Sequence, residues 1–146
     1  MRKIKFRGKD LLKGEWRYGY LHLPDGGNNL MIQVNNYDSF GVIPATIGQY
    51  TGLKDKNCRE IYEGDIVEWV FFYERLGANM GVKECDTIVK GIIRWRQGGF
   101  VLEVIENDFE NAGYYSISAL YTDTESDVEI ISNIHDNPEL IKEEEK

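Results

Sequence analysis

The stretch QYTGLKDKNCREIYEGDIV, residues 49–67, decides the fold that this sequence predicts. Thr51-Gly52 and Asp55-Lys56-Asn57 are two turn signals, because Gly adopts positive φ easily and Asp or Asn side chains bond to their own backbone. Residues 60–62 are expected to form a short extended segment before a third turn at Glu63-Gly64-Asp65. The stretch therefore predicts closely spaced turns that join short strands.

The chain before this stretch has the same character. Residues 3–7 alternate polar and apolar side chains with period two, which is typical of a half-buried strand. Residues 16–23 and 30–34 flank the turn cluster PDGGNN and form a predicted hairpin. We expect a short strand at residues 40–43, and one helical turn at residues 45–49.

The chain after this stretch begins with an almost continuous apolar run at residues 66–73, which indicates a strand buried on both faces. Residues 74–86, a mixed segment with Gly77 and Gly81, are predicted to be a loop or an irregular excursion. Residues 87–96 and 100–105 form a second predicted hairpin around Gln97-Gly98-Gly99. The inward side chains of this hairpin are expected to be Val89, Ile93, Trp95, Phe100, Leu102 and Val104, with Gly91 at a bulge or a close contact.

The C-terminal region contains two further predicted strands and a helix. Residues 114–121 alternate as a strand, with a helix as the alternative, and residues 128–134 form the last strand. Asn137-Pro138-Glu139 predicts a helix start, because Asn is a good N-cap and Pro suits the first helical position. Leu140 and Ile141 are expected to seat this helix on the body, and residues 142–146 to be frayed.

The composition is that of a single globular domain, residues 1–146, built mainly from β-strands with one or two short helices. The net charge of −8 disfavours general binding to phosphate backbones, although residues 1–20 carry +5 and residues 121–146 carry −7. No apolar run approaches the roughly 20 residues of a membrane helix, and the start lacks the apolar region of a signal peptide. We therefore expect no membrane association and a cytoplasmic location.

Three blocks of the sequence resemble the YopX family. They are IKFRGKD at residues 4–10, the opening stretch at residues 49–67, and VEIISNIHDNPELI at residues 128–141. The resemblance implies a complex fold of several coiled β-sheets and a phage or prophage protein in a host cell, and it implies no mechanism. Family members commonly have Gly at the position of Cys58. If this position needs positive φ, Cys58 is strained or the turn is rebuilt.

The sequence predicts no catalytic residue, no metal ligand and no cofactor. It contains no GxGxxG, no phosphate-binding loop and no GxSxG elbow. His22 and His135 are the only histidines, and neither has a partner at a familiar ligand spacing. Cys58 and Cys85 are expected to be reduced thiols. These observations favour a non-catalytic binding or assembly module.

Five polar residues of the opening stretch are the first candidates for a binding surface, because turn rules do not account for their polar groups. They are Gln49, Tyr50, Thr51, Glu60 and Asp65. A phage or host protein is one candidate partner, and a second copy of this chain is another, because unpaired strand edges and charge-asymmetric ends can join subunits. A hydrolase that uses Glu60, Glu63 and Asp65 is a further alternative.

A nucleic-acid-binding accessory protein is the main alternative function. Its candidate contacts are Lys3, Lys5, Arg7, Arg94, Trp95 and Arg96. The opposing interpretation is that the first three are the solvent face of a strand whose inner face is Ile4 and Phe6. The strand aromatics could stack bases or could fill the core. They are Trp16, Tyr18, Tyr20, Trp69, Phe71, Tyr73, Trp95 and Phe100.

Overall fold

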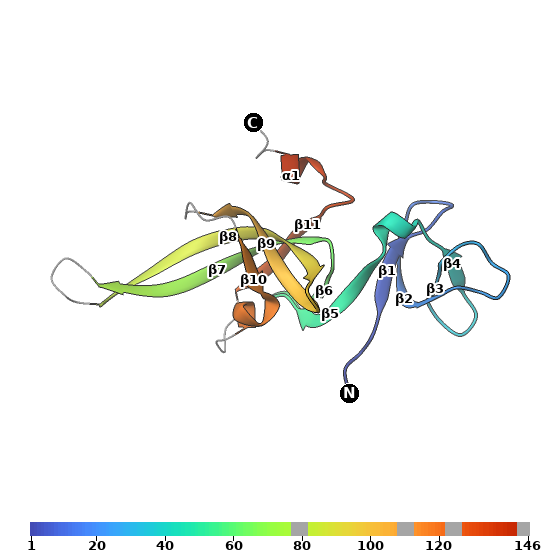
Figure 1. Cartoon of the computed structure of the whole chain (residues 1–146), viewed down its shortest axis with the longest axis horizontal. Helices are drawn as coiled ribbons and strands as arrows, with labels where there is room; N and C mark the ends of the chain where they lie inside the picture. Colours follow the sequence, from blue (N-terminus) through green and yellow to red (C-terminus); the bar gives the residue numbers. More distant parts are fainter. Residues whose placement is uncertain (77–81, 108–112, 122–126, 143–146) are drawn as a thin grey trace. The chain divides into compact units, whose positions relative to one another are not determined.

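A computed structural model describes residues 1–76, 82–107, 113–121 and 127–142 (Figure 1). The chain divides into two compact units, and the first consists of Met1–Leu53 and Glu60–Glu63. The second consists of Lys54–Arg59 and Gly64–Lys146. That residues 1–146 act as a single domain stays a prediction.

The first unit is built on one six-stranded sheet in the order β4-β3-β2-β1-β5-β6. Its elements are β1 (Phe6–Lys9), β2 (Trp16–His22), β3 (Met31–Gln33), β4 (Ser39–Gly41), the short 3-10 helix η1 (Pro44–Thr46), β5 (Gly48–Lys54) and β6 (Glu60–Tyr62). The predicted hairpin is confirmed, because β2 and β3 pair antiparallel. The helical turn predicted at residues 45–49 is only partly correct, because η1 covers Pro44–Thr46 and both Gly48 and Gln49 lie in β5.

The sheet of the first unit curls, because the chain after β4 returns to the end of β1. Asp10 and Val42 form an antiparallel bridge, and the N–H of Ile43 donates to the carbonyl of Lys9 at 2.9 Å. Val42 and Ile32 are fully buried inside this curl. A Cβ on Gly8 would lie 3.1 Å from Cβ of Val42, so the absence of a side chain at Gly8 permits this packing.

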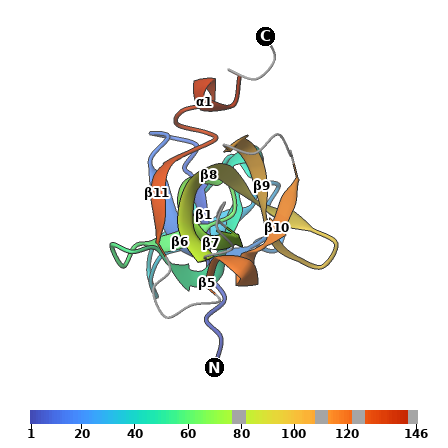
Figure 2. The same cartoon turned by 90° about the vertical axis from the view of Figure 1, so that its left-hand side faces the viewer.

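The second unit is built on one five-stranded sheet in the order β10-β9-β8-β7-β11. Its strands are β7 (Asp65–Leu76), β8 (Val82–Arg96), β9 (Gly99–Asn107), β10 (Tyr114–Ser116) and β11 (Val128–Asn133). Figure 2 views this sheet from one end and shows that it is strongly curled. The predicted fold class, mainly β with coiled antiparallel sheets and short helices, is confirmed.

The loop predicted at residues 74–86 is wrong for most of its length. β7 and β8 pair continuously from Ile66↔Ile92 to Leu76↔Val82, whereas β9 joins β8 only from Val89 onward. Residues 70–76 and 82–88 thus form a two-stranded ribbon that projects from the rest of its own sheet (Figure 1). The mixed composition with Gly77 and Gly81 suggested a loop or an irregular excursion, but it does not exclude strand pairing on either side of residues 77–81, which lie outside the described residues.

The second predicted hairpin is confirmed, with Gln97 and Gly98 at positive φ in the turn between β8 and β9. Gly91 lies at both a bulge and a close contact: the β8–β9 register shifts between Lys90 and Gly91, and a Cβ on Gly91 would lie 2.6 Å from the carbonyl oxygen of Glu103. Of the six predicted inward side chains, five are buried, and Trp95 is the exception.

The C-terminal predictions are confirmed for β11 and for the helix α1 (Glu139–Lys142). Leu140 and Ile141 pack with Ile134 against the buried cluster Ile66, Ile92 and Ile105, as expected. The strand predicted at residues 114–121 is only partly correct, because it ends at Ser116 and the 3-10 helix η2 (Ile117–Tyr121) follows.

Two predictions about the first 53 residues are wrong. Thr51-Gly52 lies inside β5 rather than in a turn, although Gly52 does adopt φ 89°. The first strand begins at Phe6 rather than residue 3, and Ile4 is exposed instead of inward.

None of the helices in the described residues has the length and the apolar character that crossing a bilayer requires.

A candidate binding face on the first unit

One face of the first sheet gathers aromatic and basic side chains. The β1–β2 register places Lys9 opposite Trp16 and Arg7 opposite Tyr18, so these four residues share a face. Tyr20 follows on the same face, because side chains alternate along β2. We call Lys9, Trp16, Tyr18 and Tyr20 the β2 face.

Two buried rings, those of Tyr62 and Tyr50, lie beside the β2 face. Tyr62 of β6 contacts Tyr18 edge-on, with ring centroids 5.4 Å apart, and it contacts Tyr50 of β5 at the same distance. Burial is the main reason why the pKa of the Tyr62 phenol lies far above its usual range. The contact with Tyr62 restrains the Tyr18 ring from one side, which limits the ordering entropy that a ligand contact at Tyr18 would cost.

Arg7 lies between these buried rings and the β2 face. Its guanidinium lies 4.6 Å from the ring centroid of Trp16 and 5.1 Å from that of Tyr62, and it donates to the carbonyl of Glu63 at 3.3 Å. The residue is only 5% exposed. The expectation that Arg7 lies on the solvent face is therefore wrong, because two rings and a carbonyl bind its charge inside the unit.

The outer part of the β2 face is open to solvent. Tyr20 is 67% exposed and Tyr18 41% exposed, whereas Trp16 is half-buried beneath the amine of Lys9, 5.4 Å from its ring centroid. Successive rings on one face of a strand are ~7 Å apart, from two residues of ~3.3 Å rise. Such a row can stack against flat groups or pack against an apolar partner while Lys9 attracts negative charge.

The charge of the chain differs between the two units. The first unit holds seven Lys or Arg and six Asp or Glu, giving +1. The second unit holds the remaining ten Lys or Arg and the remaining nineteen Asp or Glu, giving −9. The β2 face thus belongs to the less acidic part of the protein.

The polar groups of β5 and β6, predicted as a binding surface, are engaged within the first unit. Thr51 donates its hydroxyl to the carbonyl of Ile61 at 2.8 Å, and Glu60 pairs with Lys5 at 2.7 Å. The carbonyl of Gln49 accepts the N–H of Glu63 at 3.0 Å, and Tyr50 is buried. The bonds of Thr51 and Gln49 connect β5 to β6 and to Glu63, whereas Glu60 ties β6 to the segment before β1.

Asp65 belongs to the second unit, at the start of β7. It is 2% exposed and lies opposite Asn133 of β11. Glu60 and Glu63 belong to the first unit. In the described part of the chain, no group of three or more His, Cys, Asp or Glu side chains is arranged to hold a metal ion.

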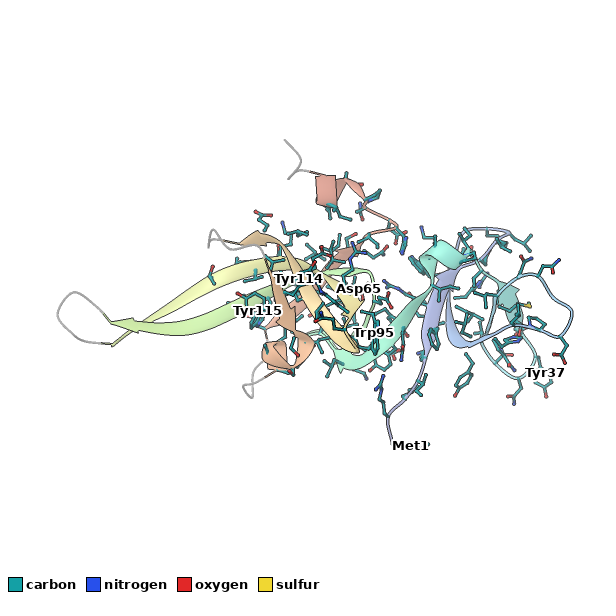
Figure 3. All side chains as sticks on the ribbon, viewed as in Figure 1. Met1, Tyr37, Asp65, Trp95, Tyr114 and Tyr115 are labelled. Carbon is teal, nitrogen blue, oxygen red and sulfur yellow. The ribbon has the colours of Figure 1, made fainter. Side chains whose placement is uncertain are left out.

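The predicted nucleic-acid contacts at the end of β8 divide between the two faces of its sheet. Arg94 pairs with Glu103 at 2.9 Å, and Arg96 lies over the ring of Tyr114 at 3.9 Å. Trp95 points to the other face, where it contacts Phe100 edge-on at 4.9 Å (Figure 3). It is 50% exposed, so the prediction that Trp95 fills the core is wrong, and alternation prevents the three residues from forming one surface.

The turn from Asp55 to Arg59 is built around a buried carboxylate. Oδ1 of Asp55 accepts the N–H groups of Asn57 and Arg59, each at 2.9 Å, and Oδ2 accepts the N–H of Ile130 at 3.1 Å. The guanidinium of Arg59 bonds to the carbonyl of Ile130, and the N–H of Lys56 donates to Val128 at 2.9 Å. The turn thereby covers the outer edge of β11.

A model of the YopX protein family matches residues 5–142, which include both units. The chain belongs to the YopX family. No curated protein matches this YopX sequence. Cys58 is exposed and adopts φ 62°, so the backbone at this position has the positive φ that Gly adopts most easily.

Sequence reasoning placed Trp16, Tyr18 and Tyr20 of this YopX chain on one side of a strand, but it left open whether that side was core or surface. Alternation fixes which residues share a face, and it says nothing about which face is covered. The basic residues opposite these rings, Lys9 and Arg7, were the available signal that this face is exposed. Arg7 is a misleading signal, because its side chain is buried.

Proposed function

We propose that this YopX-family protein is a non-catalytic binding module of phage or prophage type, and that its partner binds the β2 face. The observation that carries the proposal is the pair of exposed rings of Tyr18 and Tyr20, the first of which packs against the buried ring of Tyr62. Exposed aromatic residues on a rigid element bury large areas at small entropic cost, which makes them frequent interface anchors.

The non-catalytic assignment is supported by the state of two of the four acidic residues in residues 49–67, Asp55 and Glu60. Glu60 is neutralised by Lys5, and the Asp55 carboxylate is saturated by backbone N–H groups. A general base needs access to a substrate proton. Carboxylates that are already engaged in this way suit an architectural role better than acid–base chemistry.

Site-specific photo-crosslinking in host cells tests the proposal. A benzophenone amino acid replaces Tyr20 in one variant and Tyr37 in a second. Tyr37 is the control, because it is 95% exposed in the same unit, after β3, and lies outside the β2 face (Figure 3). We expect a discrete adduct from position 20 and none from position 37. No adduct from position 20, or the same adducts from both, would contradict the proposal.

A nucleic-acid-binding accessory protein is the second candidate, favoured by the charge of the first unit and by Lys9 beside Trp16. Base stacking on exposed rings tolerates any sequence, and phosphate contacts make binding salt-dependent. Anisotropy of a labelled single-stranded oligonucleotide at several salt concentrations tests it. Lys3→Gln combined with Lys9→Gln should weaken binding and flatten the salt dependence.

Lys90→Gln is the matched charge control for this binding experiment, because it removes a cation from the second unit, where Lys90 pairs with Glu106 at 2.9 Å. Binding by this variant should equal that of the unmodified protein. Absence of any anisotropy change at low salt removes the nucleic-acid candidate and leaves the crosslinking result to identify another class of partner.

A further inference from the structure

The turn of residues 10–14, between β1 and β2, is held by a hydrogen bond from each of its backbone N–H groups. The N–H groups of Leu12 and Lys13 donate to Oδ1 of Asp10 at 3.0 Å and 2.6 Å, and the other three donate to backbone carbonyls at 2.9 to 3.1 Å. Asp10 itself is buried, and its Oδ2 atom accepts the Nε–H of Arg17 at 2.9 Å. We call residues 10–14 the β1–β2 turn. Because its backbone is fixed, a contact at its tip costs little ordering entropy.

The tip of the β1–β2 turn carries leucines that stay exposed. Leu12 is 94% exposed, and the neighbouring Leu11 is 49% exposed. Turn positions usually carry polar residues, and the hydrogen bonds to Asp10 come from the backbone, so they require no apolar side chain at position 12. Leu12 thus contributes almost nothing to the folding of this unit, and a partner that buries it gains the hydrophobic free energy of a whole leucine.

The apolar surface at the β1–β2 turn is continuous with the β2 face. Lys9 lies opposite Trp16 on one side of β1, and on the other side its carbonyl accepts the N–H of Ile43 at 2.9 Å. Ile43 is exposed, and Leu11 follows Lys9 on the same face because side chains alternate along the chain. Side chains opposite one another on neighbouring strands lie ~5 Å apart. The aliphatic pair Leu11 and Ile43 therefore borders the row of rings across Lys9.

The charge around the β1–β2 turn is positive. Lys13 is exposed, and no ion pair joins it to the residues that the structure describes. The exposed carboxylate that follows the turn, Glu15, is paired with Arg17 at 3.0 Å, and that of Asp10 is buried. Lys9 adds a second cation on the side of the β2 face. The surface is therefore complementary to a partner that places carboxylates beside its apolar contact.

The exposed rings of the β2 face offer too little area for a stable interface by themselves. A standard interface buries ~800 Å² on each partner, whereas an aromatic side chain buries ~150–250 Å². Tyr18 and Tyr20 together reach at most about 500 Å². A partner that docks on them must contact neighbouring surface as well, and the side with Leu11, Leu12 and Ile43 is adjacent and apolar.

Leucine side chains at this border favour a protein over a nucleic acid as the partner. Bases stack on rings and phosphates attract cations, but neither provides an apolar cavity for a leucine. Protein interfaces bury such anchors in central pockets and surround them with a polar rim. An anionic bilayer fits less well, because its surface repels a chain with a net charge of −8.

We propose that the partner of the β2 face is a protein that receives Leu12 in an apolar pocket, with carboxylates at the rim of this pocket that pair with Lys13. The inference rests on the proposed function, because it assigns the β1–β2 turn and the β2 face to one partner. It narrows that partner to a protein whose binding surface is apolar at one end and acidic around it.

The yield of photo-crosslinked adduct from position 20 measures how well the partner binds when Leu12 is changed. Leu12→Ser is introduced into the variant that carries the benzophenone amino acid in place of Tyr20. Leu23→Ser is the matched control, because Leu23 is also an exposed leucine of the first unit and follows the opposite end of β2. We expect Leu12→Ser to lower the yield about tenfold at limiting protein concentration, as the loss of one buried leucine implies. Leu23→Ser should leave the yield unchanged.

The two proposals fail in different ways in this experiment. No adduct from position 20 in the protein that keeps Leu12 contradicts the proposed function, and the inference falls with it. A full yield of adduct in the Leu12→Ser variant overturns the inference alone. Equal melting temperatures of the Leu12→Ser and unmodified proteins are expected, because the side chain is exposed, and they show that the loss of yield is not a loss of folding.

Charge variants of Lys13 test the acidic rim with the same readout. Lys13→Glu should lower the yield more than Lys13→Gln, and added salt should narrow the difference, because the rim repels a carboxylate at this position. Lys54→Glu is the control, since it makes the same charge change at an exposed lysine of the second unit. Equal losses for Lys13→Glu and Lys54→Glu mean that net charge is responsible, and they overturn the assignment of the rim.

The occupant is identified by placing the benzophenone amino acid at position 12 itself. The adduct should contain the same protein as the adduct from position 20, joined through a peptide with Asp or Glu beside apolar residues. A different protein, or an adduct that nuclease digests, overturns the proposal.

Two measurements on the purified protein cover the remaining occupants of the β1–β2 turn. Light scattering over a range of concentrations detects a second copy, and flotation with vesicles of phosphatidylcholine and phosphatidylglycerol in equal parts detects a bilayer. We expect neither self-association nor vesicle binding that depends on Leu12. Either one, if Leu12→Ser abolishes it, overturns the proposal.

Discussion

The Oδ2 atom of Asp55 accepts a hydrogen bond from the backbone N–H of Ile130, 3.1 Å away and 75 positions later in the chain. This bond joins the central turn to β11 within the second unit. Since Asp55 is buried and two further N–H groups donate to its other oxygen, one carboxylate orders both the turn and a strand edge.

Asp55→Asn should destabilise the protein by about 2 kcal/mol, because an amide cannot satisfy all these donors and turns an N–H₂ group toward one of them. Chemical denaturation measures the free energy of unfolding. Asp25→Asn, which removes an equal charge from an exposed loop residue, is the control and should change stability little. Equal losses in both variants would show that net charge, not the turn, is responsible.

Stability should fall in acid. Burial acts to raise the pKa of Asp55, but hydrogen bonds from the N–H groups of Arg59, Ile130 and Asn57 outweigh it and hold this pKa below its ordinary value. The pKa of Asp10 is also lowered, chiefly by the N–H of Lys13. A folded-state pKa below the unfolded value means that the stabilisation is present above about pH 4 and is lost as the pH falls through the folded-state values.

Denaturation midpoints measured from neutral pH into acid check this expectation. The unmodified protein should lose stability below about pH 4, and Asp55→Asn should show a shallower pH dependence because one of the responsible groups is gone. The same slope in both proteins would mean that Asp55 does not contribute to the acid sensitivity.

Cys58→Gly should stabilise the protein by about 0.5 kcal/mol. Glycine relieves the cost of φ 62° for a residue with a Cβ, while it adds some entropy to the unfolded chain. Cys58→Ala is the control, since it removes the thiol but keeps the Cβ, and it should leave the melting temperature nearly unchanged. If Ala stabilises as much as Gly, the thiol and not the backbone is the source of the cost.

Gly91→Ala should destabilise by roughly 2 kcal/mol, because its Cβ would meet the carbonyl oxygen of Glu103 and Cδ1 of Leu102, each at 2.6 Å. Gly99→Ala is the matched control in the same hairpin, where nothing lies within 4 Å of an added Cβ. Thermal unfolding of both variants measures the difference. A tolerated Gly91→Ala would mean that β8 and β9 separate without cost.

Local chemistry was predictable from the residues themselves. Asp55 and Asn57 indicated a turn, and Gly91 indicated a bulge or a close contact. Each prediction depends on one residue and its near neighbours, and the structure confirms both. The hairpin through Gln97 and Gly98 is of the same kind.

What only the tertiary structure decided is which faces and edges are covered. Arg7 is buried and Trp95 exposed, although alternation along β1 and β8 suggested the reverse. Alternation assigns residues to two faces, while burial depends on whether another strand or ring lies above each face, and those come from distant parts of the chain. For the same physical reason, most of residues 74–86 proved to belong to the paired strands β7 and β8. The hydrogen bonds between these two strands stabilise an extended backbone, and the local sequence does not reveal that pairing.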